Sequence, residues 1–408
     1  MKTSLKNWWF SSSSSKPTKF KRLEICDWKQ FSILDIEFHE RLTILTDPNG
    51  CGKTTILNIL ASHFKLPINE LNTPTNLNGE WRFYFTDSKS DTEEIGTITY
   101  ENGVIGHLQR STENSITYQI KITSQQNVPG YYLPEQRQTF RYLPVEKSNL
   151  TITTLSQAFK SILNIFKAQP STNERHPTSY YIKQTLLSSN DQSESNQDFI
   201  DFQEILRKVL PKTLGFNRLE VRGSEVVVLT NSDEWLLDGA SGGISTLIDL
   251  AWQIFIFDKE SDSGITMLID EIENHLHASL QRSILPDLVS TFPKVQFIIA
   301  THSPLIIGSV KDSSVYTLKN NENLRVESEL LDLKNKAKSA TIILNQILGV
   351  PFTMPIWVED ELKRVVSEFT KGDLNDDTLK SMRLRLREIG LEDLMPEAIK
   401  DLIDGKVN

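Results

Sequence analysis

Cysteine is scarce in this chain, which carries only Cys26 and Cys51 among its 408 residues. Two thiols that do not form a CxxC pair cannot build a disulfide framework or a four-ligand zinc site. Long apolar runs are lacking too: no segment approaches the roughly 18 apolar residues that cross a bilayer, and residues 1–15 have no apolar core of about 7 to 15 residues like that of a signal peptide. We therefore expect a cytoplasmic protein with no membrane partner.

Basic residues are in the minority, with 44 Lys and Arg against 53 Asp and Glu, and the formal net charge is −9. This balance argues against a surface that binds nucleic acid everywhere, so nucleic acid is a possible local partner but not the primary one. Residues 1–23 are the exception, because they contain basic residues and no acid. We expect residues 1–19, which include the run Ser11–Ser15, to be a basic flexible tail.

Proline and glycine are also few, at 16 and 18 residues, which excludes a collagen-like chain. Hydrophobic residues make up 38% and charged residues 24%, so the chain can bury a core and wholesale disorder is excluded. At about 150 residues per domain, the length indicates two to three domains, or one large domain with insertions.

Apolar patterns predict strands in the first third and in the second half of the chain. The segments KRLEICDWKQF, ILDIEF and RLTILT have strand patterns, and the last leads into a glycine-rich turn and a helix that begins near Lys53 and stops before Pro67. Residues 81–123 have period two and a turn at Asn102-Gly103, which predicts an antiparallel β-meander. The apolar runs GITMLID and VQFIIATHS are typical of parallel strands that are buried on both faces.

Helical periodicity fills most of the remaining chain. Residues 151–187 and 198–210 predict an inserted helical region, the strand pattern ends near Leu318, and helices follow at about 334–368 and 376–403. We therefore expect an α/β fold with a mixed or parallel core sheet, an antiparallel β-meander, a helical insertion and a C-terminal helical hairpin. The expected divisions are the tail (1–19), a first lobe (20–145), the helical insertion (146–215), a second lobe (216–330) and a C-terminal helical region for assembly or partner binding (331–408).

The C-terminal region carries two apolar stripes at helical spacing. They consist of Leu362, Val365, Val366 and Phe369, and of Leu379, Met382, Leu386 and Ile389. Two amphipathic helices of this kind predict a hairpin. Phe352 and Trp357 beside prolines favour an interface with a partner. The alternative is that packing of the hairpin consumes both stripes and leaves a solvated cap.

A candidate phosphate-binding loop lies between a predicted strand and a predicted helix. It consists of Asn49, Gly50, Cys51, Gly52, Lys53, Thr54 and Thr55. Its backbone N–H groups and the helix N-terminus suit phosphate anions, Lys53 would reach the β and γ oxygens, and the Thr54 hydroxyl would ligate Mg²⁺. The pattern GxxxxGK[ST] requires glycine where the chain has Asp47, a carboxylate that could weaken nucleotide binding or be turned outward. The alternative is a plain glycine-rich turn.

Two adjacent carboxylates, Asp270 and Glu271, end the apolar run MLI. Since adjacent residues of a strand face opposite ways, their tasks can differ. Asp270 would hold Mg²⁺ through water beside Thr54, and Glu271 would orient or deprotonate the attacking water. His302 ends the next apolar run and could donate to the γ-phosphate. Taken alone, the carboxylates could be a helix cap, and the histidine a core or surface residue.

Two further groups invite a chemical interpretation. Ser241, Gly242 and Gly243 precede a helix expected to start near Ser245, and form a second anion-binding helix N-terminus. Because one chain rarely needs two γ-phosphate sites, this end would cap the nucleotide held by Lys53 of another copy, which predicts a two-fold dimer with two composite sites. A flexible turn is the alternative. The segment ENHLH has two histidines beside Glu271 and Glu273, but they underdetermine a metal site.

In this order, the motifs resemble those of the ABC-type ATPase head, in the branch related to SMC and OLD-family proteins. DPNGCGKTT looks like its Walker A, ASGGI its signature, MLIDE its Walker B and ATHS its H-loop, over roughly residues 20–318. The resemblance implies ATP and Mg²⁺ as cofactors, hydrolysis of ATP, and a Q-loop glutamine on the metal, for which Gln136 is the candidate and Gln138 nearly as good. Asp47 in the Walker A, and Ala240 and Ile244 in the signature, depart from the family and imply slow or regulatory turnover.

No nuclease pattern follows the histidine motif, and the short chain looks like the ATPase subunit of prokaryotic anti-phage systems of the Septu and retron-associated type. That resemblance implies a homodimer or higher homo-oligomer that closes around nucleotide and controls a separate effector, an HNH nuclease. The alternative is an SMC-like DNA-binding ATPase of DNA repair or maintenance. Its groove would be lined by Lys160, Lys167, Arg175 and Lys183. A transport ATPase is disfavoured, because the chain lacks a spanning segment.

Overall fold

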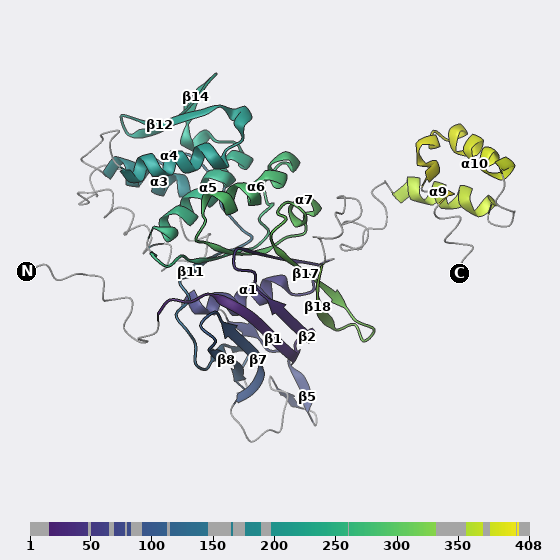
Figure 1. Ribbon diagram of the computed structural model, residues 1–408, viewed down its shortest axis with the longest axis horizontal. Coiled ribbons are helices and arrows are strands. Elements are labelled where there is room, and N and C mark those ends of the chain that lie inside the picture. The colour runs from purple at the N-terminus through teal and green to yellow at the C-terminus, as the bar shows by residue number, and fades with distance from the viewer. Residues whose placement is uncertain are drawn as a thin grey trace, which may run out of the picture. The chain divides into compact units, whose positions relative to one another are not determined.

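A computed structural model describes the protein over most of its length (Figure 1). The described residues are 16–47, 50–64, 69–77, 80–82, 92–111, 115–145, 165, 176–188, 197–259, 261–331, 356–369, 376–396 and 398–399. The chain divides into two compact units, Met1–Ala340 and Thr341–Asn408.

An 11-stranded mixed sheet runs through the described part of the first unit. Its order is β10-β8-β7-β1-β2-β18-β17-β3-β16-β15-β11. The strands are β1 (Phe20–Trp28), β2 (Phe31–Glu37), β3 (Leu42–Thr46), β7 (Thr92–Tyr100), β8 (Ile105–Ser111), β10 (Ile120–Ile122), β11 (Gly130–Leu133), β15 (Thr266–Ile269), β16 (Gln296–Ala300), β17 (Ser314–Asn320) and β18 (Val326–Leu330).

The strands β11, β15, β16, β3 and β17 pair in parallel, in that order. Every residue of β3, β15 and β16 is buried, as the near-continuous apolar runs of these segments predict. Their carboxyl ends lie at one edge of the sheet, because parallel strands point the same way. In open α/β sheets that edge is where ligands bind.

The other strands of the same sheet pair in antiparallel fashion, except that β18 pairs with β2 in parallel. β1 pairs with β2 and β7, and β7 pairs with β8 through the turn at Asn102-Gly103, where Gly103 has a φ of +82°. A positive φ is the conformation that glycine adopts without strain, so the hairpin prediction is confirmed. Ile25 and Leu34 face each other across β1 and β2 and are buried, while Cys26 is exposed.

Helix α1 (Lys53–Ala61), followed by the short helix η2 (Ser62–Phe64), packs between the two parts of the sheet. Its apolar residues Ile56, Leu57 and Leu60 are buried in one cluster with Leu268 of β15 and Ile25 of β1. Burial on both sides explains why the helix carries a broad apolar surface. In Figure 1, α1 lies on the opposite side of the parallel strands from α5, α6 and α7.

The helices on that opposite side form a second layer. They are α3 (Thr178–Ser188), α4 (Gln197–Val209), α5 (Gly242–Asp258), α6 (Ala278–Thr291) and α7 (Pro304–Ile307). α5 is the centre of the layer, and its residues 245–257 are all buried. The Phe202 ring of α4 meets Trp252 in an edge-on contact and Phe255 in a tilted one. α5 begins at Gly242, three residues before the predicted Ser245, because Ser241 already occupies the N-cap position.

Smaller sheets complete the described part of this unit. β12 (Phe216–Arg222), β13 (Glu225–Thr230) and β14 (Glu234–Leu236) form an antiparallel sheet, and the pairs β4 (Glu70–Leu71) with β9 (Thr117–Tyr118) and β5 (Thr75–Leu77) with β6 (Glu80–Arg82) are short. Short 3₁₀ turns are η5 (Lys212–Leu214) and η6 (Leu237–Gly239).

The prediction that strands end near Leu318 is wrong, because β18 follows and lies between β17 and β2. Its sequence VESEL carries little apolar signal. Backbone pairing with β17 and a hydrogen bond from the Asp35 N–H to the Ser328 hydroxyl, at 2.8 Å, hold it in place instead.

The second unit contains α9 (Ile356–Phe369), α10 (Asp376–Glu388) and the turn η7 (Glu392–Leu394). Its own core consists of Leu362, Val365, Val366, Met382, Leu386 and Ala398. All eight residues of the two predicted stripes lie in this core or pack against it, so the predicted hairpin uses both stripes for its own packing. Trp357 is 64% exposed, and Phe352 lies outside the described residues. Among the described helices of the whole chain, none has the length and apolarity to cross a membrane.

Candidate functional site

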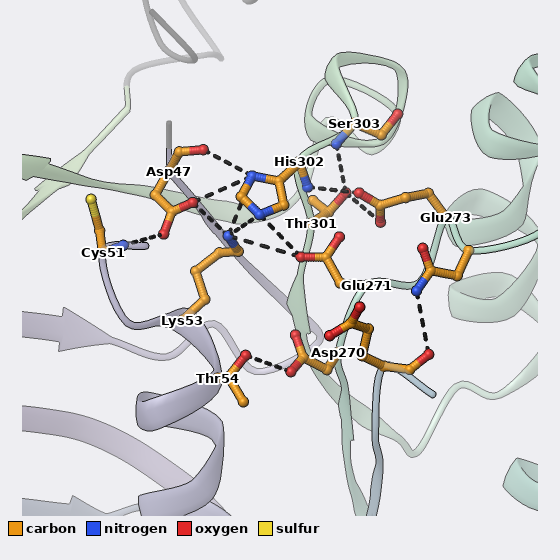
Figure 2. A network of polar contacts seen from close by, with 12 residues as sticks. Asp47, Cys51, Lys53, Thr54, Asp270, Glu271, Glu273, Thr301, His302 and Ser303 are labelled. Atoms are coloured by element: carbon orange, nitrogen blue, oxygen red, sulfur yellow. Dashed lines mark hydrogen bonds and ion pairs between the residues drawn. The ribbon is translucent and has the colours of Figure 1, made fainter. Parts of the chain in front are cut away.

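A cluster of polar side chains lies at the carboxyl edge of the parallel strands (Figure 2). Lys53 and Thr54 begin α1 directly after the loop that follows β3, and Asp270 and Glu271 follow β15. His302 comes two residues after β16. The parallel pairing of β3, β16 and β15 brings these distant segments together.

Lys53 occupies the centre of the cluster and is only 4% exposed. Its Nζ lies 2.5 Å from Asp47 Oδ1, 2.6 Å from His302 Nε2 and 4.0 Å from Glu271 Oε1. A buried ammonium needs such partners, because desolvation of an unpaired charge is costly. Lys53 is therefore held where an anion would meet it.

The loop before Lys53 requires glycine at two positions. Gly50 and Gly52 have φ angles of +76° and +95°, which L side chains rarely adopt. A Cβ on Gly52 would also lie 2.7 Å from the Phe31 ring. Gly52 is the N-cap of α1 and no side chain caps this end, so the N-terminus of the helix faces the loop uncapped. Cys51 is buried, Thr55 is half-buried and Asn49 lies outside the described residues.

Asp47 is turned inward, which excludes the outward orientation that the sequence left open. It is 1% exposed, its Oδ1 contacts Lys53, and its Oδ2 accepts a hydrogen bond from the Cys51 N–H at 3.1 Å. Its carboxylate therefore neutralises the lysine that the loop would offer to phosphate.

Thr54 and Asp270 form the second part of the cluster. The Thr54 hydroxyl donates to Asp270 Oδ2 at 2.7 Å, and the Tyr132 hydroxyl donates to the same oxygen at 3.4 Å. Asp270 Oδ1 is buried and has no hydrogen-bond partner among the described residues. Burial raises the pKa of the Asp270 carboxyl, and the Thr54 hydrogen bond opposes that shift.

This donor set fits Mg²⁺, which prefers carboxylate and hydroxyl oxygens and keeps several waters. The unpartnered Asp270 Oδ1 supplies an oxygen for a hydrated cation beside the Thr54 hydroxyl. Among the described residues, no group of three or more His, Cys, Asp or Glu side chains could hold a metal by itself. A cation here would share its ligands with a phosphate and water.

Glu271 and His302 form a pair, with Glu271 Oε1 at 3.1 Å from His302 Nε2. Burial raises the pKa of Glu271, but the His302 contact and the Lys53 charge outweigh it and leave the pKa lowered. The Glu271 contact raises the pKa of His302, although burial and the Lys53 charge oppose it. The lowered pKa keeps Glu271 a carboxylate, which is the charge of a proton acceptor.

Glu273 fixes the backbone that carries His302. Its two carboxylate oxygens accept from the Thr301 hydroxyl at 2.8 Å and from the His302 N–H at 2.7 Å. Glu273 is thus a structural support and not a partner of His275 or His277. His277 caps α6, accepting from the Ser279 N–H.

The Ser241–Gly243 end of α5 is not joined to the Lys53 cluster. Ser241 and Gly242 are exposed, and Ser241 makes no side-chain cap. A Cβ on Gly243 would lie 3.1 Å from the Leu280 side chain and 3.4 Å from His275 O, so this end packs beside the loop after Glu271. Within the described residues, no hydrogen bond or ion pair connects it to Lys53.

Two contributors to the site were missed in the sequence. Tyr132 and Arg137 flank the segment in which Gln136 was chosen as a metal ligand, and Gln136 itself is exposed. Arg137 is buried and donates to the backbone of the turn after β15. A single arginine between two glutamines carries no periodic signal, so only the three-dimensional contact identifies it.

Lys183 was assigned to a DNA groove in the alternative hypothesis, and that assignment is wrong. Its ammonium is 1% exposed and pairs with Asp238, while Leu143 O accepts from it at 2.7 Å. With its ammonium held by Asp238 and Leu143 O inside the protein, Lys183 does not line a groove that is open to DNA. The other three groove candidates, Lys160, Lys167 and Arg175, lie outside the described residues.

Comparison with known proteins identifies relatives of this chain. Residues 42–308 match the family described as "AAA domain, putative AbiEii toxin, Type IV TA system". The retron Vc95 probable ATPase of Vibrio cholerae is 22% identical, over 73% of each chain. The retron Ec83 probable ATPase of Escherichia coli is 25% identical, over 34% of this chain and 32% of its own length. The Septu protein PtuA of Bacillus mycoides is 28% identical, over 50% of this chain and 29% of its own length. The alignments with these last two thus span about a third of the relatives' own length.

Two solved structures of SMC heads are also similar. The SMC head domain from Thermotoga maritima has a TM-score of 0.41 and 14% identity, over 77% of this chain and 99% of that one. The SmcHead bound to the C-winged helix domain of ScpA has a TM-score of 0.44 and 15% identity, over 79% and 100%.

Proposed function

This chain belongs to that AAA-domain family, and we propose that it is an ATPase that binds ATP with Mg²⁺ and hydrolyses it at the Lys53 cluster. The predicted resemblance to retron-associated and Septu ATPases is confirmed by the relatives. The observation that carries the proposal is the meeting, at one sheet edge, of Lys53, the Thr54–Asp270 pair and the Glu271–His302 pair.

Phosphate binding would use the loop and the start of α1. The backbone N–H groups of residues 50–55 surround the anion, and the Lys53 ammonium contacts the β and γ oxygens. For this, Lys53 has to exchange its contacts with Asp47 and His302 for phosphate oxygens. Thr54 and Asp270 would hold Mg²⁺, which neutralises phosphate charge when bound. Gln136 stays a predicted further ligand.

Glu271 would accept the proton of the attacking water. Its lowered pKa keeps it a carboxylate, and the turn after β15 places it 4.0 Å from Lys53. His302 would donate a hydrogen bond to the γ-phosphate, and Glu273 would hold its backbone for this task. Hydrolysis then depends mainly on positioning and on charge neutralisation, as is general for phosphoryl transfer.

The Ser241–Gly243 end of α5 would act on a second copy. It is exposed and separate from Lys53 in its own chain, which supports a two-fold dimer in which each copy caps the nucleotide of the other. Because the departures at Asp47, Ala240 and Ile244 affect both halves of such a site, we propose slow or regulatory turnover.

We further propose that the ATPase works in anti-phage defence, in the cytoplasm, and controls a separate effector, an HNH nuclease. The names of the retron and Septu relatives support the defence role. The C-terminal region 331–408 is the proposed site of assembly or partner binding, and the exposed Trp357 is its best anchor. The alternative, an SMC-like DNA-binding ATPase, is weakened because Lys183 is buried and paired with Asp238. The net charge of −9 also argues against DNA binding as the primary role.

Lys53→Ala tests the proposed function. Loss of the ammonium removes charge-assisted contacts that no neighbour can replace, so binding of labelled ATP with Mg²⁺ should weaken by roughly 100-fold or more. The control is Lys319→Ala, which removes an exposed lysine of β17 that is paired with Glu329. Binding by Lys53→Ala within about threefold of wild type would overturn the assignment of the loop.

A further inference from the structure

Arg137 lies four residues beyond β11 and is 8% exposed. Its Nη1 donates to Asp270 O at 3.0 Å, and its Nη2 donates to Glu271 O at 2.7 Å and to Ile272 O at 3.4 Å. One guanidinium thus contacts three successive carbonyl groups. These carbonyls belong to the turn that carries both carboxylates of the site.

That turn needs support, because Glu271 has a φ of +45°. The left-handed region is sparsely populated by residues with a side chain, and it persists only where surrounding contacts enforce it. The turned backbone lets Asp270 face Thr54 while Glu271 faces His302 (Figure 2). Arg137 therefore contacts the backbone of Asp270 and Glu271, whose conformation points one side chain toward Thr54 and the other toward His302.

The charge of Arg137 is matched to its surroundings. Burial lowers its pKa, and the carboxylates of Asp249, Glu273, Asp270 and Glu271 oppose that shift. Asp249 belongs to α5, is 4% exposed and accepts from Gln253 Nε2 at 2.8 Å. The guanidinium is therefore a buried cation among the acids of α5 and of the turn.

We infer that Arg137 is a positioning residue for ATP hydrolysis: it holds the turn 270–272 so that Glu271 is aimed at the attacking water. This inference rests on the proposed function. Lysine cannot replace arginine here, because a single ammonium cannot span three carbonyl oxygens with the geometry of the guanidinium fork. Arg137 does not touch the nucleotide, and the Thr54 hydroxyl holds the Asp270 side chain from another element, so we expect the chemical step to change more than ATP affinity.

The test is Arg137→Lys in the full chain, which keeps the charge and removes the fork. A misplacement of Glu271 by about 1 Å should lower the single-turnover rate of ATP hydrolysis by roughly 10- to 100-fold, with KM and ATP affinity within about threefold of wild type. Glu271→Gln is assayed beside it, and adding Arg137→Lys to Glu271→Gln should lower the rate little further, because both act on one group.

The matched control is Arg41→Lys. The Arg41 guanidinium also contacts carbonyls, with Nη1 2.6 Å from Val295 O, and Nη2 2.6 Å from Val289 O and 2.9 Å from Phe292 O. It precedes β3, at the end of the strand opposite the Lys53 cluster. The same substitution there should cost stability and leave the rate of hydrolysis within about twofold.

The outcomes separate the inference from the function on which it rests. If wild type hydrolyses ATP and Arg137→Lys does so at the same rate, the inference alone is overturned. The same holds if Arg137→Lys and Arg41→Lys lose rate equally, or if Arg137→Lys loses ATP affinity without losing rate. A wild type without hydrolysis would overturn the proposed function and the inference with it. If Arg137→Lys does not fold, Arg137→Gln is assayed with the same expectation; failure of both to fold would make Arg137 a folding residue and overturn its positioning role.

Discussion

At the residue scale, Asp47 is the feature that most sets this site apart from the general phosphate-loop pattern. A glycine at position 47 would leave the Lys53 ammonium free to contact phosphate oxygens, whereas the buried Asp47 carboxylate lies 2.5 Å from that ammonium. The same carboxylate accepts from the Cys51 N–H, so it also shapes the loop. A bound triphosphate would meet both a neutralised lysine and a like charge.

We therefore predict that Asp47→Asn binds ATP more tightly, by roughly 3- to 30-fold, because the negative charge is lost while the amide oxygen still accepts from Cys51. Equilibrium binding of labelled ATP with Mg²⁺ measures the change. The matched control is Asp35→Asn, which removes an exposed carboxylate of β2 that is paired with Arg22 and should leave affinity unchanged. Equal or weaker binding by Asp47→Asn would show that the carboxylate does not compete with phosphate.

The sequence singled out Lys53, Thr54, Asp270, Glu271 and His302 because each follows an apolar strand in a chemically recognisable pattern, and the structure brings these five residues together. It could not give the orientation of Asp47, which depends on the loop closing over a buried lysine. Nor could it give Arg137, Tyr132 and the supporting task of Glu273, since these contacts join segments more than twenty residues apart.

At the element scale, apolar runs and turns predicted most of the strands and helices. The segments MLI and FIIA are buried on both faces and could be read directly as parallel strands. β18 was missed because VESEL is held by backbone pairing and not by an apolar face. The α9–α10 hairpin was predicted from its two apolar stripes, and the residues of both stripes pack in its core.

We predict that Leu362→Ala destabilises the hairpin by about 2–5 kcal/mol, because the side chain is fully buried between α9 and α10 and its removal leaves a cavity. Hydrogen exchange of the amides in α9 and α10 measures the loss of protection. Leu384→Ala is the matched control, since Leu384 lies on α10 and is 61% exposed. Equal effects of the two substitutions would contradict the assignment of the core.

At the scale of the whole molecule, one sheet unites the antiparallel strands around β1 with the parallel strands that carry the site, and α1 packs against both parts. The loop before Lys53 and the Ser241 end of α5 belong to this first unit, but no described contact joins them. The proposed dimer would bring the loop of one copy to the Ser241 end of another.

Mixing two defective proteins tests this geometry. Ser241→Arg in one copy and Lys53→Ala in the other break both sites of each homodimer, whereas the mixed dimer concentrates both lesions in one site and leaves the other intact. An equal mixture should recover about a quarter of wild-type hydrolysis if subunits exchange freely, since half of the dimers then have one of two sites. No recovery in demonstrated heterodimers would contradict composite, independent sites.

We propose that the Lys53 cluster is one hydrolytic site, in which Glu271 is the proton acceptor and not a binding group. Glu271→Gln keeps the shape of the side chain and the Thr54–Asp270 pair but removes the base. Single-turnover hydrolysis of bound ATP with Mg²⁺ is the most direct measurement. We predict that ATP binds with affinity within about threefold of wild type while hydrolysis slows by roughly 100-fold or more. Hydrolysis at the wild-type rate would contradict it.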